Sequence, residues 1–257
     1  MLRYGTMSYN GEHGLLEFHD KSKLDSLNHP RTIVTHLTYD ILPSSIKRGV
    51  GKVVYVVRNP KDVFASYKYF NNALSSRYYK GNADGFLRKF LSNEFFGSGG
   101  SWFTCTKEWT DGITSNTALQ VHTIMYEELK KDTYGEIEKL AKFLEIDYDD
   151  DLLRSVVTNT TFDKLKADHA TAAGATDRWA DMCEDGRQKV GFVGDWKNEL
   201  TVSQNELFDA VIQEKFTNST RVSPADATGH VAEYCEAPRT AGVFILLFHL
   251  EQIRFNI

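Results

Sequence analysis

The chain has 257 residues, of which 41% are hydrophobic and 25% are charged, and its formal net charge is -5 at pH 7. This composition is close to the average of soluble globular proteins, which argues against disorder along the whole chain. The mildly acidic balance argues against general nucleic-acid binding, because that function requires a basic face. The length accommodates one large α/β domain or two small ones.

Cysteine and histidine usage indicates neither a metal site nor a disulfide framework. The three cysteines, Cys105, Cys183 and Cys235, are widely spaced and form no CxxC pair, and the eight histidines do not cluster at ligand spacing. A reducing compartment is the simplest interpretation. The N-terminal residues lack the apolar run of a signal peptide, and residues 243–248 are far fewer than the ~20 that span a bilayer. We therefore expect a cytoplasmic protein that does not associate with a membrane.

Apolar, β-branched runs predict strands at residues 32–37, 52–57 and 119–125. The second run is continuously apolar after its lysine, as expected for a strand buried on both faces of a parallel sheet. Apolar residues at helical spacing predict the following helices: one from Val63, then 83–95, 101–109, one from Tyr126, 133–144, 149–158 and 201–216. The alternation predicts a three-layer α/β sandwich with a central, mostly parallel sheet.

The character of the chain changes after residue 217. Residues 218–241 contain two prolines and several small residues without a clear period, and residues 243–257 are apolar without amphipathic order. We therefore predict one domain over residues 1–217 and a divergent C-terminal tail over residues 218–257, to which no helix or strand is assigned.

Arg58 follows the predicted strand 52–57 and precedes a helix, at the strand end where open α/β sheets bind ligands. A guanidinium forms bidentate, charge-assisted bonds to phosphate, and Ser66, about two turns further on, adds a hydroxyl donor. The alternative is a helix-start turn in which Arg58 only pairs with Asp62. Residues 55–67 resemble the segment with which cytosolic sulfotransferases grip the 3′-phosphate of 3′-phosphoadenosine 5′-phosphosulfate (PAPS). The resemblance implies that Arg58 and Ser66 bind this phosphate.

A second match is the string Val-Thr-His-Leu-Thr at residues 34–38, which resembles the family pattern K-T-H-L-P. It implies that His36 is the catalytic base, a role that suits a side chain with a pKa near physiological pH. Val34 replaces the family lysine that helps neutralise charge on the bridging oxygen, and Thr38 replaces the proline. The first replacement weakens the expected stabilisation of the transition state.

A third match is the string at residues 189–197, which resembles the family signature R-K-G-x-x-G-D-W-K. It implies that the loop with Lys189, Val190 and Gly191 covers the 3′-phosphate, where glycine permits a close approach. The valine replaces a family lysine, so one positive charge is lost.

Shorter matches place further residues beside the nucleotide or at a subunit contact. Tyr126 corresponds to a tyrosine that contacts adenine, and the string N-T-T-F places Thr160 and Phe162 by the nucleotide, although aromatic residues at such places are ordinarily core. The family dimer motif K-x-x-x-T-V-x-x-x-E is complete, which implies a homodimer. Its residues are Lys197, Thr201, Val202 and Glu206. The alternative, a solvated helix start with Thr201 as N-cap, is compatible with the dimer.

The family's phosphate loop, roughly T-Y-P-K-S-G-T-T-W, has no counterpart in this sequence, and no GxxxxGK[ST] pattern replaces it. The resemblance therefore implies a P-loop NTPase-like sulfotransferase fold that is incomplete at the N-terminus. We predict a PAPS-dependent sulfotransferase that acts on a hydroxyl or amine of a small molecule and releases the desulfated nucleotide PAP.

Two other interpretations remain open. One is a catalytically inactive relative that binds nucleotide or pairs with a full-length subunit. The other is a P-loop nucleoside kinase, which the missing phosphate loop and the string Gly-Asp-Trp-Lys at residues 194–197 count against.

Overall fold

The computed structural model describes Ser22, Ser26, residues 31–73, 79–92, 101–161, Lys164, and residues 192–217 and 243–248. Its strands are β1 (Arg31–Thr35), β2 (Lys52–Val57), β3 (Val121–Met125) and β4 (Val243–Phe248). Its helices are η2 (Tyr39–Ile41), α2 (Ser44–Lys47), α3 (Pro60–Ala73), α4 (Ala83–Leu91), α5 (Trp102–Ser115), α6 (Tyr126–Lys131), α7 (Thr133–Leu144), α8 (Asp150–Asn159), α11 (Trp196–Glu199) and α12 (Val202–Thr217).

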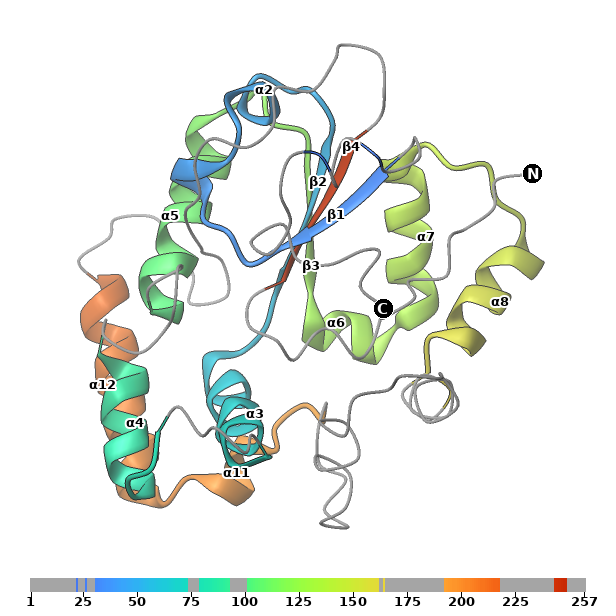
Figure 1. The fold of residues 1–257 in the computed structure, drawn as a ribbon. Coiled ribbons are helices and arrows are strands. Elements are labelled where there is room, and N and C mark those ends of the chain that lie inside the picture. Colours follow the sequence, from blue (N-terminus) through green and yellow to red (C-terminus); the bar gives the residue numbers. More distant parts are fainter. Residues whose placement is uncertain are drawn as a thin grey trace.

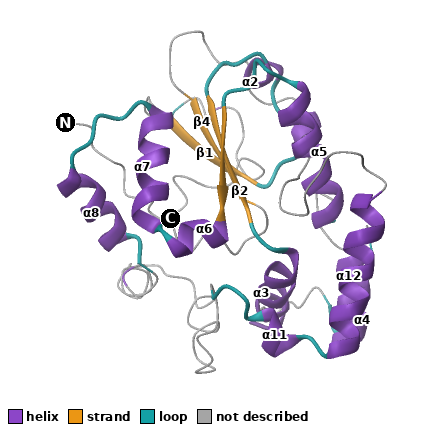
Figure 2. Cartoon of the chain, turned by 180° about the vertical axis from the view of Figure 1, so that it is seen from behind, coloured by secondary structure: helices purple, strands orange, loops and turns teal. Residues whose placement is uncertain are grey.

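In the described residues the strands form a sheet in the order β1-β4-β2-β3, and every pair is parallel. The sheet stands in the middle of the fold, with α2 and α5 on one side and α7 and α8 on the other (Figures 1 and 2). The predicted α/β architecture with a central parallel sheet is therefore confirmed. The described helices include none that is long and apolar enough to cross a membrane.

Strand β2 divides the core between the two faces of the sheet. Val53, Tyr55 and Val57 belong to a cluster with α3, α4, α5 and α12, and the ring of Tyr55 stacks on that of Trp109 at 5.5 Å. The alternate residues, Val54 and Val56, pack with residues of β3, α6 and α7. Successive side chains of a strand point to opposite faces, so this unbroken apolar run is buried on both sides, as its sequence predicts.

Several helices begin at side chains that cap their first turn. Asn82, Ser101, Asp132 and Asp149 each accept a hydrogen bond from the backbone N–H three residues further on. Such caps satisfy amide groups that have no partner within the helix. They set the starts of α4, α5, α7 and α8, which lie within a residue of the predicted ones.

Helix α5 extends beyond the predicted end at Trp109, to Ser115. The added residues include weak helix formers, so local propensity does not account for the extension. Gly112 lies against the ring of Tyr39, where an added Cβ would come within 2.4 Å of ring atoms. Close packing onto η2 therefore holds this last part of the helix in place.

The largest departure from the sequence analysis is β4. No element was assigned to residues 243–248, yet they form a strand between β1 and β2 (Figure 1). A six-residue apolar run carries no period that distinguishes a strand from a buried helix segment. The division of the chain at residue 217 stays a prediction.

Candidate functional site

Arg58 directly follows β2 and is buried, with 3% of its surface exposed. Its Nη2 donates to the carbonyl of Phe192 at 2.9 Å, and its guanidinium lies over the ring of Tyr126, 4.4 Å from the centroid. Within the described residues, Nε and Nη1 are buried without a hydrogen-bond partner. Buried polar groups in proteins are nearly always satisfied, so this cation has donors available for an anionic ligand.

Tyr126 begins α6, immediately after β3, and is fully buried. Burial raises the pKa of Tyr126 to about 12, and the neighbouring Arg58 opposes this rise in part. The Nζ of Lys130 lies 5.6 Å from the same ring, and burial followed by repulsion from Arg58 lowers the pKa of this lysine. A neutral phenol thus lies next to two cations, and the carboxylates of Glu127 and Asp62 act on the same hydroxyl.

Ser66 lies on α3 and is buried. Its Oγ has no hydrogen-bond partner among the described residues. Asp62 lies four positions earlier in the same helix, so the two residues share one face. The hydroxyl is therefore a second unsatisfied polar group on the helix that starts two residues after Arg58.

The segment from Phe192 to Trp196 is fastened to the β2–α3 turn. The Asp62 carboxylate accepts the backbone N–H of Gly194 at 2.8 Å and that of Trp196 at 3.2 Å. The Nζ of Lys61 lies 4.5 Å from the centroid of the indole ring of Trp196. The alternative pairing of Arg58 with Asp62 is therefore not what the structure records, because both carboxylate oxygens accept backbone N–H groups.

Gly194 adopts a left-handed conformation, with φ at +84°. Residues with a Cβ rarely adopt this conformation, whereas glycine adopts it readily. The turn directs the amides of Gly194 and Trp196 at one carboxylate. Lys189, Val190 and Gly191, which precede this turn in the sequence, and Phe162 lie outside the described residues.

His36 directly follows β1 and is partly buried. Thr35 pairs with Leu247 of β4, and Leu247 pairs with Tyr55 of β2, so His36 stands at the level of Val56, across one intervening strand. Neighbouring strands lie about 4.8 Å apart, which places the two backbones about 10 Å from each other. His36 and Arg58 thus follow the carboxyl ends of β1 and β2, at one edge of the sheet.

Thr160 ends α8, and its Oγ1 donates to the carbonyl of Val156 at 2.8 Å. The same carbonyl also accepts the backbone N–H of Thr160 at 3.0 Å. Its placement beside a nucleotide, like that of Phe162 and the adenine contact of Tyr126, stays a prediction. No group of acidic, histidine and cysteine side chains in the described part of the chain has the arrangement of a metal site.

The four residues of the dimer motif, Lys197, Thr201, Val202 and Glu206, are exposed. Thr201 and Gln204 form a reciprocal cap: Thr201 N donates to the side-chain oxygen of Gln204, and Gln204 N donates to Thr201 Oγ1. Thr201 is therefore the N-cap of α12, as the alternative interpretation expected.

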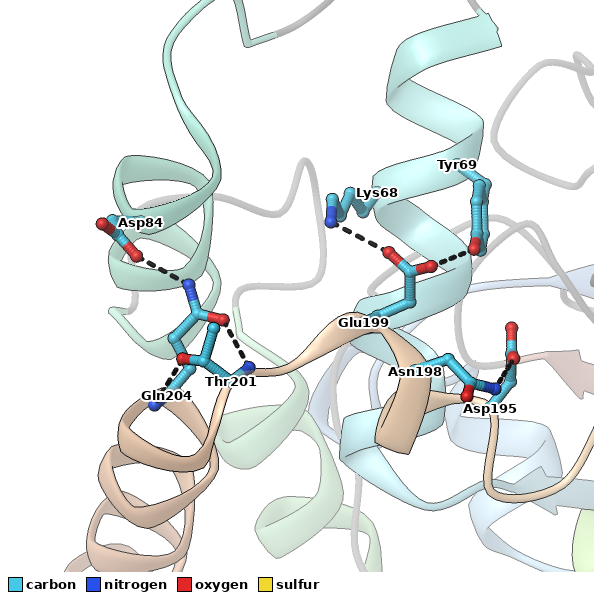
Figure 3. Close-up of polar contacts among 8 residues, drawn as sticks. All are labelled: Lys68, Tyr69, Asp84, Asp195, Asn198, Glu199, Thr201 and Gln204. Atoms are coloured by element: carbon cyan, nitrogen blue, oxygen red, sulfur yellow. Dashed lines mark hydrogen bonds and ion pairs between the residues drawn. The ribbon is translucent and has the colours of Figure 1, made fainter.

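Neighbouring side chains attach this motif to α3 and α4 (Figure 3). The Glu199 carboxylate accepts from Lys68 at 2.9 Å and from the hydroxyl of Tyr69, and Gln204 donates to Asp84 at 2.6 Å. None of these five residues carries a sequence motif that predicted such a role. The dimer motif specifies only its four exposed residues. Glu199 and Gln204 fall at positions that the motif leaves unspecified, so the sequence gives no signal for their contacts.

The chain belongs to the sulfotransferase family. A family model described as "Sulfotransferase domain" matches residues 11–220.

Individual relatives agree with this assignment. The chain is 35% identical over 197 residues to Sulfotransferase 1B1 of Mus musculus, an alignment that covers 74% of this chain and 62% of the relative. It is 32% identical over 202 residues to an amine sulfotransferase of Oryctolagus cuniculus, with coverage of 76% and 64%. The chain thus spans less than two thirds of the length of these relatives.

A solved structure agrees as well. The crystal structure of mouse sulfotransferase SULT7A1 complexed with PAP superimposes with a TM-score of 0.64 at 31% sequence identity. The superposition covers 80% of this chain and 74% of the mouse chain. The sulfotransferase fold predicted from the sequence is therefore confirmed.

Proposed function

We propose that the chain is a PAPS-dependent sulfotransferase, which transfers a sulfuryl group to a hydroxyl or amine of a small molecule. The observation that carries the proposal is Arg58, a buried cation with hydrogen-bond donors that no described residue uses. A mouse relative of the same fold was solved with PAP. The 3′-phosphate of such a nucleotide supplies the anion that the free donors require.

In this proposal Arg58 and Ser66 bind the 3′-phosphate. The segment with Lys189, Val190 and Gly191 covers that phosphate, because it leads directly into Phe192, whose carbonyl accepts the Arg58 bond. The buried Ser66 hydroxyl, like the guanidinium, has capacity for a ligand. Tyr126 supports the guanidinium, which lies over its ring, and Thr160 and Phe162 complete the nucleotide site. Arginine suits this role because its planar guanidinium can donate two hydrogen bonds to one phosphate.

We propose His36 as the general base. The acceptor oxygen or nitrogen attacks sulfur, the bond from sulfur to the phosphate oxygen breaks, and His36 takes the proton that the acceptor loses. The leaving group is PAP. Positioning and charge neutralisation dominate group transfers of this type, so the fixed distance between β1 and β2 matters as much as the base itself.

The first experiment is calorimetric titration of the purified chain with PAP. The Arg58→Ala substitution is expected to lower the affinity roughly 10- to 100-fold, the loss expected for a charge-assisted hydrogen bond. Arg58→Lys should recover only part of the affinity, because lysine keeps the positive charge but lacks the paired N–H donors of the planar guanidinium. Arg48→Ala removes an exposed arginine at the end of α2 and serves as the matched control. Equal affinity of the Arg58→Ala variant and the parent chain would contradict the assignment.

The second experiment measures release of PAP from PAPS with a panel of phenols, alcohols and amines. His36→Gln is expected to slow turnover by roughly 10²- to 10⁴-fold, the usual contribution of a general base, without changing PAP affinity. A parent chain that binds PAP but turns over none of the acceptors would favour the inactive nucleotide-binding alternative instead.

We also propose that the chain forms a homodimer through Lys197, Thr201, Val202 and Glu206, and that it is cytoplasmic. The support for the dimer is the exposure of Val202, whose side chain is 77% accessible on a helix start that Glu199 and Gln204 hold in place. Protein interfaces place an apolar centre inside a polar rim, and Val202 would supply that centre here.

Sedimentation across a range of protein concentrations tests the dimer. Val202→Glu is expected to shift the protein to monomer, because it places a charge at the centre of the contact. Gln213→Glu introduces the same charge at another exposed position of α12 and should leave the assembly unchanged. A parent chain that is monomeric at every concentration would contradict the proposal.

A further inference from the structure

Strand β4 lies outside the part of the chain that matches the sulfotransferase family. The family match ends at residue 220, and β4 covers Val243–Phe248. The strand nevertheless occupies an inner position of the sheet. It pairs with β1 over residues 243–247 and with β2 over residues 244–248, and both pairings are parallel and continuous.

The composition of β4 suits this position. The segment reads Val-Phe-Ile-Leu-Leu-Phe, so it contains no polar residue, no glycine and no proline. Parallel strands that are covered on both faces have continuous apolar sequences of this kind. Its neighbour β2 shows the same property, because Val53 to Val57 are each at most 2% exposed. Proline and glycine would weaken a strand at an inner position.

The position of β4 determines how β1 is attached to the rest of the sheet. Within the described residues, β1 pairs with β4 and with no other strand. The opposite edge of β4 pairs with β2, which carries Arg58 at its end. The route from His36 to Arg58 through the hydrogen-bonded sheet therefore passes through residues 243–248.

We propose that residues 243–248 are a positioning strand, supplied by the same chain, that fixes β1 and thereby His36 at its distance from β2 and Arg58. The part that concerns His36 rests on the proposed function. The placement of β1 by β4 does not depend on it, and both tests below are carried out on the full chain without nucleotide. A failure of the proposed function therefore leaves their outcome unchanged.

Amide hydrogen exchange tests the dependence of β1 on β4. Leu246→Pro removes a backbone N–H from the middle of β4, and we expect the amides of residues 32–34 to exchange roughly 100-fold faster. The amides of α7 and α8 should keep their protection, which shows that the rest of the chain is folded. Val243→Pro is the matched control, because proline is tolerated at the first residue of a strand. Unchanged exchange of residues 32–34 in a folded Leu246→Pro variant would overturn the proposal.

Cysteine cross-linking tests the register and the origin of the strand without a disruptive substitution. Thr32 and Phe244 are register partners, so Thr32→Cys combined with Phe244→Cys should form a disulfide under mild oxidation. Thr32→Cys with Leu247→Cys is the mismatched control, because its second position lies three residues, roughly 10 Å, further along the strand. Both pairs are made in a chain with Cys183→Ser and Cys235→Ser.

The proposal expects a cross-linked monomer from the matched pair and no cross-link from the mismatched one. A disulfide-linked dimer from the matched pair would show that a second copy supplies the strand, and would overturn the assignment to the same chain. Equal cross-linking of the two pairs would overturn the register. If Leu246→Pro unfolds the whole chain, these cross-links decide the question by themselves.

Discussion

The carboxylate of Asp62 accepts the backbone N–H of Gly194 at 2.8 Å, across 132 residues of sequence. The same carboxylate accepts the N–H of Trp196, and only 1% of Asp62 is exposed. A buried carboxylate is costly unless it is hydrogen-bonded. The segment from residue 192 onward thus supplies the hydrogen bonds that the buried Asp62 carboxylate requires. The same hydrogen bonds hold this segment against α3.

Asp62→Asn is expected to lower the free energy of unfolding by about 1–3 kcal/mol, the cost of a buried hydrogen-bonding group that loses its partner. The amide keeps one acceptor oxygen but presents an NH₂ group to the second backbone N–H. Urea denaturation measures the loss. Asp111→Asn changes an exposed carboxylate that pairs with Lys107, and it should cost less than about 1 kcal/mol. Similar losses for the two variants would contradict the anchoring role.

Gly194→Ala tests the left-handed turn. An added Cβ meets no atom within 4 Å, so the only cost is the backbone conformation at φ +84°. That cost is about 1–2 kcal/mol for an alanine. Gly194→Asn should cost less, because asparagine adopts left-handed conformations more readily. Thermal unfolding with far-UV circular dichroism provides the comparison, and an alanine variant as stable as the parent would refute the argument.

Phe208 is expected to be among the most sensitive positions of the core. It is fully buried, and its ring lies against those of Phe64, Phe90 and Phe103, which come from three different helices. Phe208→Ala should cost about 3–5 kcal/mol through lost burial and the cavity left behind. The neighbouring Leu207 is 45% exposed, and Leu207→Ala should change the stability by no more than about 0.5 kcal/mol. Urea denaturation of the two variants gives both losses in the free energy of unfolding, and their ratio tests this expectation.

His122 is expected to make the fold less stable in acid. Its ring stacks on Phe143 at 5.3 Å, and its Nε2 is buried without a hydrogen-bond partner in the described residues. Burial lowers the pKa of His122, while Glu136 raises it and Lys139 lowers it by smaller amounts. As the pH falls, His122 of the unfolded chain becomes protonated near its ordinary pKa of about 6.5. In the folded chain the same histidine becomes protonated only at a lower pH.

This difference removes stability as the pH falls from about 6.5 through the lower pKa of the folded state. His122→Phe keeps the ring and removes the titration, so its free energy of unfolding should decline less between pH 7.5 and pH 5.5 than that of the parent. Urea denaturation at the two pH values gives both declines. Equal declines would exclude His122 as a source of acid sensitivity.

The elements that the sequence predicted well are those whose information is local. The apolar run of β2 and the arginine at its end stand next to each other in the chain, so both the strand and the position of Arg58 at the sheet edge were predictable. Thr201 as the N-cap of α12 was expected for the same reason, whereas its partner Gln204 was not.

The relationships that escaped prediction involve partners without a sequence signal. Asp62 binds backbone N–H groups, and almost any residue provides such a group, so no pattern in the sequence names its partners. The apolar run of β4 is equally compatible with several neighbours. Its register is set by β1 and β2, which lie about 200 residues earlier in the chain.

The long-range pairing of β4 has a consequence for the order in which the protein is made. Arg31 meets Val243, about 210 residues later, so β1 cannot join the sheet until nearly all of this sequence has left the ribosome. At the usual rates of translation the wait is on the order of 10 to 40 seconds. During that time the edges of β1 and β2 are open templates for other strands. Chaperone binding to nascent chains should therefore be concentrated on these two segments until the last strand emerges.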